Sequence, residues 1–347
     1  MTRRLGTVLV LAAAAAGCAS TWSLRGQDAA VALQWPFAPN RAKVTYVRSL
    51  TGVDRHGNGG ARLAGIVTGK DAAAGNAFVL PVAVATGRDD RLAVADTGRR
   101  GVHLVQPATH AYQALCGTKQ EPLVSPVGVA FDDDLRLWVT DSSGKLFAFG
   151  ADGRPLLVRT KAGDAPLLRP TGVAYGAAKR LVYVVDTVAC AVHAFRADDG
   201  AFAFSFGKRG TGAGEFNFPT SIFRTAGGEL FVTDSLNFRV AIFDDAGTPR
   251  GAFGHHGDGS GDMALPKGLA VDGDGVVYVA DALLDNVQLF DRSGGFLVTV
   301  GQRGFGDGEF WLPSGVFISG KGELYVCDTY NRRIQVFRIT ERYDHAS

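Results

Sequence analysis

Short apolar segments recur along the chain at a nearly constant interval. In each unit a Pro opens one apolar segment, a turn follows, and a second apolar segment ends in Asp. These six Asp residues stand 45, 45, 48, 47 and 47 positions apart, and they are Asp96, Asp141, Asp186, Asp234, Asp281 and Asp328. Third segments such as 239–243 and fourth segments such as 296–300 complete the units. Four short antiparallel strands at this period make one propeller blade, so the sequence predicts an all-β, six-bladed β-propeller.

Closure of the ring requires a strand from the N-terminal part of the chain. The sixth unit supplies only three strands and ends at residues 338–340. An open ring would leave an unpaired sheet edge. Residues 44–50 are the favoured fourth strand, and residues 63–67 are a second candidate.

Two segments carry a family resemblance. Residues 207–219, with Gly214-Glu215-Phe216, and residues 324–337, with Asp328 and Arg333, resemble the NHL repeat. From about residue 41 to 340 the chain resembles bacterial exported six-bladed NHL lipoproteins, most closely in its last three units. The resemblance also extends to two enzyme groups, the peptidyl-hydroxyglycine amidating lyases and the gluconolactonases. It therefore implies an alternative function, that of a metal-dependent lyase or lactone hydrolase of the propeller type.

The first residues read as an export signal. Arg3 and Arg4 precede an apolar run over residues 5–17, which is shorter than the roughly 20 residues of a membrane-spanning helix. Ala15-Ala16-Gly17-Cys18 resembles a lipobox, although an ordinary signal peptide with an incidental Cys18 is the alternative. We expect a signal peptide over 1–17, lipidated Cys18 and a tether over 18–40, the propeller over 41–341 and a tail over 342–347. Because Ser20 is not the Asp that retains such lipoproteins at the inner membrane, attachment to the outer membrane of a Gram-negative cell envelope is expected.

Composition supports a turn-rich, exported β protein. Gly makes up 46 of 347 residues, about twice the usual share. Lys and Arg number 36 against 34 Asp and Glu, and loss of Arg3 and Arg4 balances the charges. This balance gives no support for nucleic-acid binding, and an RNA-binding role also conflicts with the export signal.

The innermost strands offer no set of groups for catalysis. Their first positions are Val82, Val127, Thr171, Thr220, Ser221, Lys267 and Ser314, without His, Asp or Glu. We therefore predict no catalytic residues, no cofactor and no metal. The recurring Asp residues are expected to accept bonds from loop N–H groups, and Asp234 and Asp328 to pair with Arg239 and Arg333. Asp272-Gly273-Asp274-Gly275 is read as a hairpin turn rather than a calcium loop, and Cys327 as a buried core residue.

A binding surface is predicted where the blade-to-blade linkers and the second-to-third turns share one face. Large apolar and basic residues occur there, whereas Asp-rich turns occupy the opposite face. Aromatic residues mixed with Arg are typical of interface hot spots. The predicted binding residues are Phe238, Arg239, Lys267, Leu283, Leu284, Trp311, Tyr330, Arg332 and Arg333, with Phe218 and Trp311 alternatively packing between blades. The expected partner is a cell-envelope protein that binds a monomeric propeller.

Overall fold

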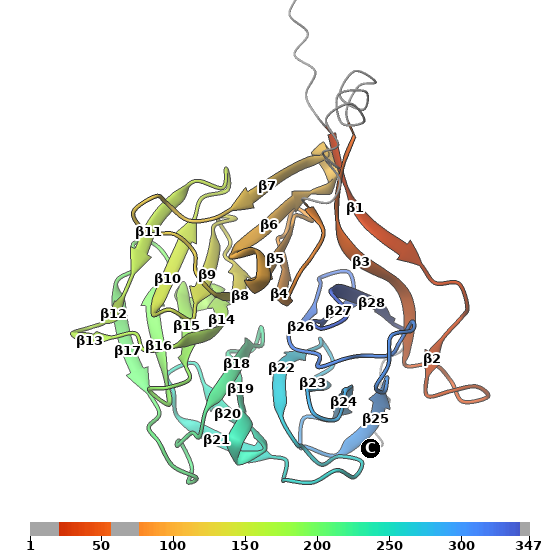
Figure 1. Cartoon of the computed structure of the whole chain (residues 1–347). Helices are drawn as coiled ribbons and strands as arrows, with labels where there is room; N and C mark the ends of the chain where they lie inside the picture. The colour runs from red at the N-terminus through yellow and green to blue at the C-terminus, as the bar shows by residue number, and fades with distance from the viewer. Residues whose placement is uncertain (1–20, 57–75, 341–347) are drawn as a thin grey trace, which may run out of the picture.

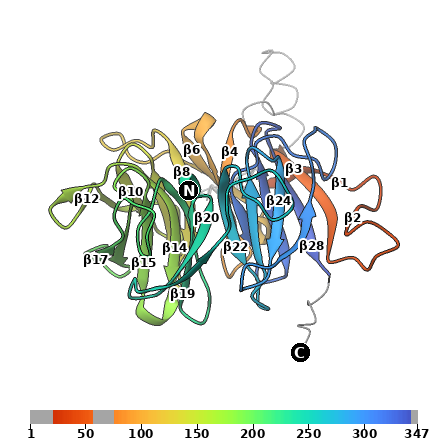
Figure 2. The same cartoon turned by 90° about the horizontal axis from the view of Figure 1, so that it is seen from below.

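The structure is a computed structural model that describes residues 21–56 and 76–340, so Cys18 and residues 63–67 lie outside the described parts. Figure 1 shows six blades arranged around a central axis, and Figure 2 shows the same ring from its edge. The prediction of an all-β, six-bladed propeller with four-stranded antiparallel blades is confirmed. The described residues include no helix that is long and apolar enough to span a bilayer.

Five blades are built from consecutive strands, with the innermost strand first. They are β4 (Pro81–Thr86), β5 (Leu92–Asp96), β6 (Gly101–Gln106) and β7 (Ala111–Leu115) in blade 1; β8 (Pro126–Phe131), β9 (Leu137–Asp141), β10 (Lys145–Phe149) and β11 (Pro155–Arg159) in blade 2; β14 (Pro170–Gly176), β15 (Leu181–Asp186), β16 (Ala191–Arg196) and β17 (Phe202–Phe206) in blade 3; β18 (Pro219–Arg224), β19 (Glu229–Asp234), β20 (Arg239–Asp244) and β21 (Pro249–Phe253) in blade 4; and β22 (Pro266–Val271), β23 (Val277–Asp281), β24 (Asn286–Phe290) and β25 (Phe296–Val300) in blade 5. The short pair β12 (Lys161–Ala162) and β13 (Ala165–Pro166) lies in the linker between blades 2 and 3.

Blade 6 joins the two ends of the described chain. Its strands β26 (Val316–Ile318), β27 (Glu323–Asp328) and β28 (Arg333–Ile339) are followed in the sheet by β3 (Val44–His56). In this antiparallel pair Ile334 lies opposite Leu50, and Ile339 lies opposite Val44. The favoured closing strand over residues 44–50 is therefore the one that the structure uses.

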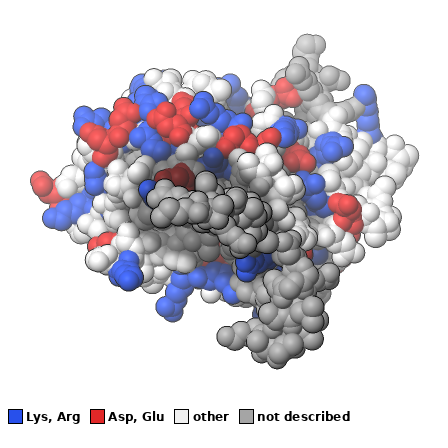
Figure 3. All heavy atoms as spheres, turned by 90° about the horizontal axis from the view of Figure 1, so that it is seen from above, with Lys and Arg blue, Asp and Glu red and all other residues white. Residues whose placement is uncertain are grey.

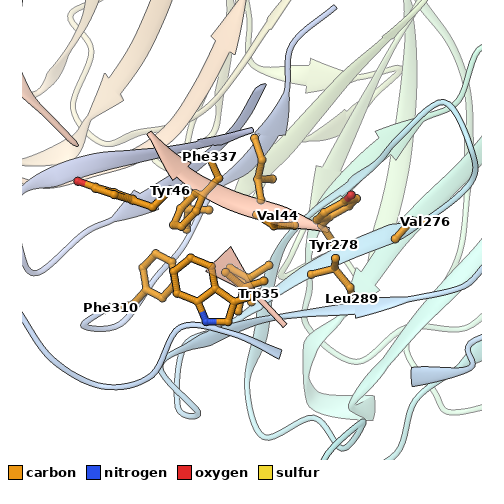
Figure 4. Close-up of a cluster of buried hydrophobic side chains, with 13 residues drawn as sticks. Trp35, Val44, Tyr46, Val276, Tyr278, Leu289, Phe310 and Phe337 are labelled. Atoms are coloured by element: carbon orange, nitrogen blue, oxygen red, sulfur yellow. The ribbon is translucent and has the colours of Figure 1, made fainter. Parts of the chain in front are cut away.

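The described part of the predicted tether is folded. β1 (Thr21–Asp28) pairs with β3 as a fifth strand, and β2 (Gln34–Trp35) pairs with the start of β3. Trp35 is 6% exposed, and its ring centroid lies 5.7 Å from that of Phe337. Figure 4 shows both side chains within the same buried cluster. The prediction of a tether up to residue 40 is wrong for residues 21–40, because alternating Trp22 and Leu24 and the buried Trp35 give this segment an apolar side to pack.

The six recurring Asp residues fasten each blade to the linker that precedes it. Each is at most 1% exposed and accepts bonds from linker N–H groups. Asp186, for example, accepts from Leu168 N at 2.6 Å and from Arg169 N at 3.0 Å. Equivalent bonds reach Asp96, Asp141, Asp234, Asp281 and Asp328. The predicted structural role of these residues is confirmed.

Hydroxyl groups connect neighbouring blades at the axis. The residue after each Asp is Thr or Ser in five blades, and in four of them it donates to the Pro carbonyl that opens the next innermost strand. Thr329 thereby bonds Pro81 O at 2.9 Å and links blade 6 to blade 1. Ala282 is the exception in blade 5.

Candidate functional site

We call the surface that carries the blade-to-blade linkers and the second-to-third turns the linker face. Strand order places both kinds of loop at the same end of each blade, because antiparallel neighbours alternate in direction. The bonds from linker N–H groups to the Asp at the end of each second strand show this proximity directly. Loops at the other end form the opposite face.

Exposed apolar side chains gather on the linker face. The second residue after the recurring Asp is apolar in blades 3 to 6, and its exposure is 42% for Val188, 40% for Leu236, 60% for Leu283 and 51% for Tyr330. Phe305, in the linker before blade 6, is 72% exposed. On the opposite face the turn between β2 and β3 carries the exposed Phe37, whereas the turns within blades 1 to 5 carry no exposed large apolar residue. We call these five residues of the linker face, together with Trp311, the apolar arc.

The strongest part of the apolar arc is an aromatic cluster. The Trp311 ring lies 5.5 Å from Phe305 and 5.4 Å from Tyr330, measured between centroids. Trp311 is half-buried, and its backbone N–H is held by Asp328 at 2.8 Å. The cluster therefore stands on a fixed base, while its two outer rings are open to solvent.

Two predicted binding residues, Arg239 and Arg333, have structural contacts instead. Nε of Arg333 lies 2.7 Å from Asp328 Oδ2, and the same side chain donates to the carbonyls of Gly306 and Glu309. Arg239 likewise pairs with Asp234 at 2.9 Å and holds its linker. Burial raises the pKa of Asp328 despite the bonds from Trp311, Asn331 and Arg333. Both Arg residues therefore fix the linkers, whereas Arg332 remains exposed on this face.

The remaining predicted residues divide between surface and interior. Leu284 is half-buried, and Phe238 is half-buried with its ring 4.3 Å from that of His256. Arg332 is exposed in the turn before β28. Phe218, considered as a plug between blades, is half-buried beside the axis under Arg209, with the guanidinium carbon 5.4 Å from the ring centroid. Another linker position, two residues before Phe218 in the first of these linkers, is fully buried in three linkers. Its residues are Phe216, Met263 and Phe310.

Lys267 lies apart from the arc, at the axis of the ring. A cavity of about 520 Å³ follows this axis, lined mainly by the innermost strands, and its linker-face mouth includes Arg169, Phe218, Leu236 and Lys267. Burial lowers the pKa of Lys267, nearby Arg169 lowers it further, and Asp281 opposes the shift. The sequence identified Lys267 but not Arg169 as part of this mouth.

Charge on the opposite face is balanced locally. Asp132 pairs with Arg136 at 2.7 Å, and Asp134 pairs with Arg180 at 2.6 Å. Lys179 pairs with Asp245 at 2.5 Å. Figure 3, which views the ring from its edge, shows acidic and basic side chains interspersed on that side as well. The Asp-rich turns therefore do not create the acidic face that their sequence suggested.

Groups for metal binding do not converge in the described parts of the chain. Within residues 21–56 and 76–340 no three His, Cys, Asp or Glu side chains form a potential metal site. His255 lies 2.5 Å from Asp262 at an exposed loop, and Asp272 accepts bonds from Asp274 N and Val276 N as a hairpin turn. Cys327 is fully buried, as predicted.

The fold and the linker geometry define a six-bladed β-propeller, and residues 310–337 match the NHL repeat. The chain thus contains the repeat that its sequence resembled. No curated protein sequence matches it.

Solved structures share the fold at low sequence identity. A gluconolactonase from Xanthomonas campestris is 15% identical, with a TM-score of 0.59 over 76% of this chain and 87% of that one. A catalytically inactive virginiamycin B lyase from Staphylococcus aureus with quinupristin is 10% identical, with a TM-score of 0.57 over 92% and 100%. An auxiliary nutrient binding protein from Bacteroides ovatus is 13% identical, with a TM-score of 0.59 over 77% and 71%. These similarities concern the fold, which hosts both enzymes and binding proteins.

Proposed function

We propose that this chain is a lipid-anchored binding propeller of the cell envelope that engages a protein through the apolar arc. The observation that carries the proposal is the concentration of exposed apolar residues at equivalent turn positions in blades 3 to 6. Contiguous apolar groups in water are typical of interaction sites, and aromatic residues supply much of the energy of such interfaces. A nutrient-binding protein among the fold neighbours is consistent with a binding role.

The surroundings of the arc indicate the chemistry of the partner. Arg303 and Arg332 are exposed beside the aromatic cluster, and Arg209 and Lys208 are exposed beside blade 4. Basic groups at the rim favour a complementary acidic rim. The partner is therefore a protein whose surface has an apolar centre surrounded by acidic residues.

Site-specific crosslinking tests this proposal. A photoreactive residue replaces Phe305 in the full-length protein, and the same residue replaces Leu156, which is 56% exposed on the outer strand of blade 2. We expect one envelope protein to crosslink at position 305 and not at position 156.

A double variant then tests the arc. Leu283→Asp with Tyr330→Ala should weaken binding of the crosslinked protein by about tenfold or more, because it removes two exposed apolar contacts. Leu156→Asp is the matched control and should leave binding unchanged. Equal binding by the double variant, or crosslinking only to lipid, would contradict the proposal.

A further inference from the structure

Blade 5 departs from the other blades at the axis. In blades 3, 4 and 6 the residue after the opening Pro carries a hydroxyl that bonds the hydroxyl following the recurring Asp. The Oγ atoms of these pairs, Thr171 with Thr187, Thr220 with Ser235 and Ser314 with Thr329, lie 2.9, 2.8 and 2.7 Å apart. In blade 5 both members differ, because Lys267 and Ala282 occupy the two positions. Val82 and Val127 hold the first position in blades 1 and 2, so Lys267 is the charged member of this ring of six.

The Lys267 ammonium has no side-chain partner among the described residues, and neither has the Arg169 guanidinium. The nearby Asp281 carboxylate is occupied, since it accepts from the N–H groups of Ala264, Leu265, Leu283 and Leu284. Two cations therefore share one mouth of the cavity, and the nearby acid, Asp281, directs its oxygens to these N–H groups rather than to either cation. Repulsion between the two cations is unfavourable, and an anion that enters between them relieves it.

The cavity behind these cations is lined mainly by apolar residues and has the size of a ligand site. Its wall includes Val82, Val84, Val127, Val129, Val173 and Val316, and its mouth includes Phe218 and Leu236. A volume of about 520 Å³ lies within the range of roughly 300 to 1,000 Å³ that is usual for small-molecule sites. The cavity therefore combines a charged entrance with an interior in which apolar residues predominate.

We infer that the channel binds a small amphipathic carboxylate, with its carboxylate held by Lys267 and Arg169 and its apolar part inside the cavity. Charge-assisted bonds from both cations orient the carboxylate, and burial of the apolar part adds affinity. Arg209, stacked over Phe218, adds positive charge near the same mouth. This site shares Leu236 with the apolar arc, but it does not rest on the proposed protein partner.

Calorimetry with octanoate tests the inference on the full-length protein. Octanoate should bind at one site per chain, at least tenfold more tightly than octan-1-ol or acetate, because only octanoate offers both the charge and the apolar chain. Equal affinity for octan-1-ol would show that the cations do not contribute to binding. Equal affinity for acetate would show that the apolar channel does not contribute to binding.

Variants identify the residues. Lys267→Met should weaken octanoate binding at least tenfold, and Arg169→Gln should weaken it severalfold. Lys208→Met is the matched control, since Lys208 is exposed on the linker face beside Glu215, with 3.3 Å between Nζ and Oε1. It should bind octanoate like the unaltered protein. Unchanged binding by Lys267→Met would overturn the inference.

Two further variants separate binding from folding. Lys267→Thr combined with Ala282→Thr rebuilds the hydroxyl pair of blades 3, 4 and 6, so it should lose octanoate binding without a lower melting temperature. Leu283→Asp with Tyr330→Ala should keep octanoate binding, which distinguishes failure at this site from failure of the proposed protein interface. Octanoate binding that survives the rebuilt pair would contradict the assignment of Lys267.

Discussion

At the scale of single residues, neighbouring arginines have opposite roles. Arg333 is buried and bonds both Asp328 and the carbonyls of the preceding linker, whereas Arg332 is exposed. Sequence reasoning recognised that Arg333 can pair with Asp328, yet it also assigned Arg333 to the binding surface. The structure shows the first role, because Nε bonds the Asp328 carboxylate and Nη2 donates to two backbone carbonyls.

Removal of the buried guanidinium should therefore destabilise the propeller. Arg333→Ala leaves the Asp328 carboxylate buried without its cation, and we expect a loss of about 3 kcal/mol in the free energy of unfolding. Guanidinium chloride denaturation measures this change. Arg332→Ala is the adjacent control and should shift stability by no more than about 0.5 kcal/mol. Equal stability of the two variants would contradict the structural role of Arg333.

Some of the exposed apolar residues on the linker face could be predicted from the sequence. Leu283 and Tyr330 were identified because they stand in turns with other large residues. Val188 and Leu236 occupy the same place two residues after the recurring Asp, and an alignment of the internal repeats gives that signal. Arg169 carried no such signal, since its position at the cavity mouth depends on how blades 3 to 5 meet around the axis.

At the scale of elements, the N-terminal strands are part of blade 6. β3 closes the ring, and β1 and β2 pack beside it. The period of the repeat and the missing fourth strand predicted closure from the sequence. The packing of residues 21–40 was not predicted, because two prolines and weak periodicity obscure a segment whose main anchor is one tryptophan.

Trp35 should make a large contribution to stability. Trp35→Ala opens space among Phe337, Phe310 and the Gly308 turn, and such changes in a core cost about 3 to 5 kcal/mol. Thermal and denaturant unfolding measure the loss. Phe37→Ala is the matched control, since Phe37 is 65% exposed two residues away. Equal stability of Trp35→Ala and Phe37→Ala would show that this segment does not pack against the propeller.

At the scale of the whole molecule, export and anchoring remain predictions from the first eighteen residues. We expect a radioactive fatty acid to label the protein in cells and Cys18→Ala to abolish the label, because acylation requires the thiol. Cys116→Ala is the control, since Cys116 is an exposed cysteine of the propeller. Label that persists on Cys18→Ala would show that this cysteine does not carry the anchor.

The folded start of the propeller limits its reach from a membrane. β1 begins at Thr21, three residues after Cys18, and three residues span at most about 11 Å when fully extended. A lipid on Cys18 would therefore hold the propeller close to the bilayer, without a long linker between them. Encounters would then take place in a thin layer at the membrane surface, where the effective concentration of membrane-bound molecules is high. Partners attached to the same membrane would be favoured over molecules that diffuse freely through the surrounding compartment.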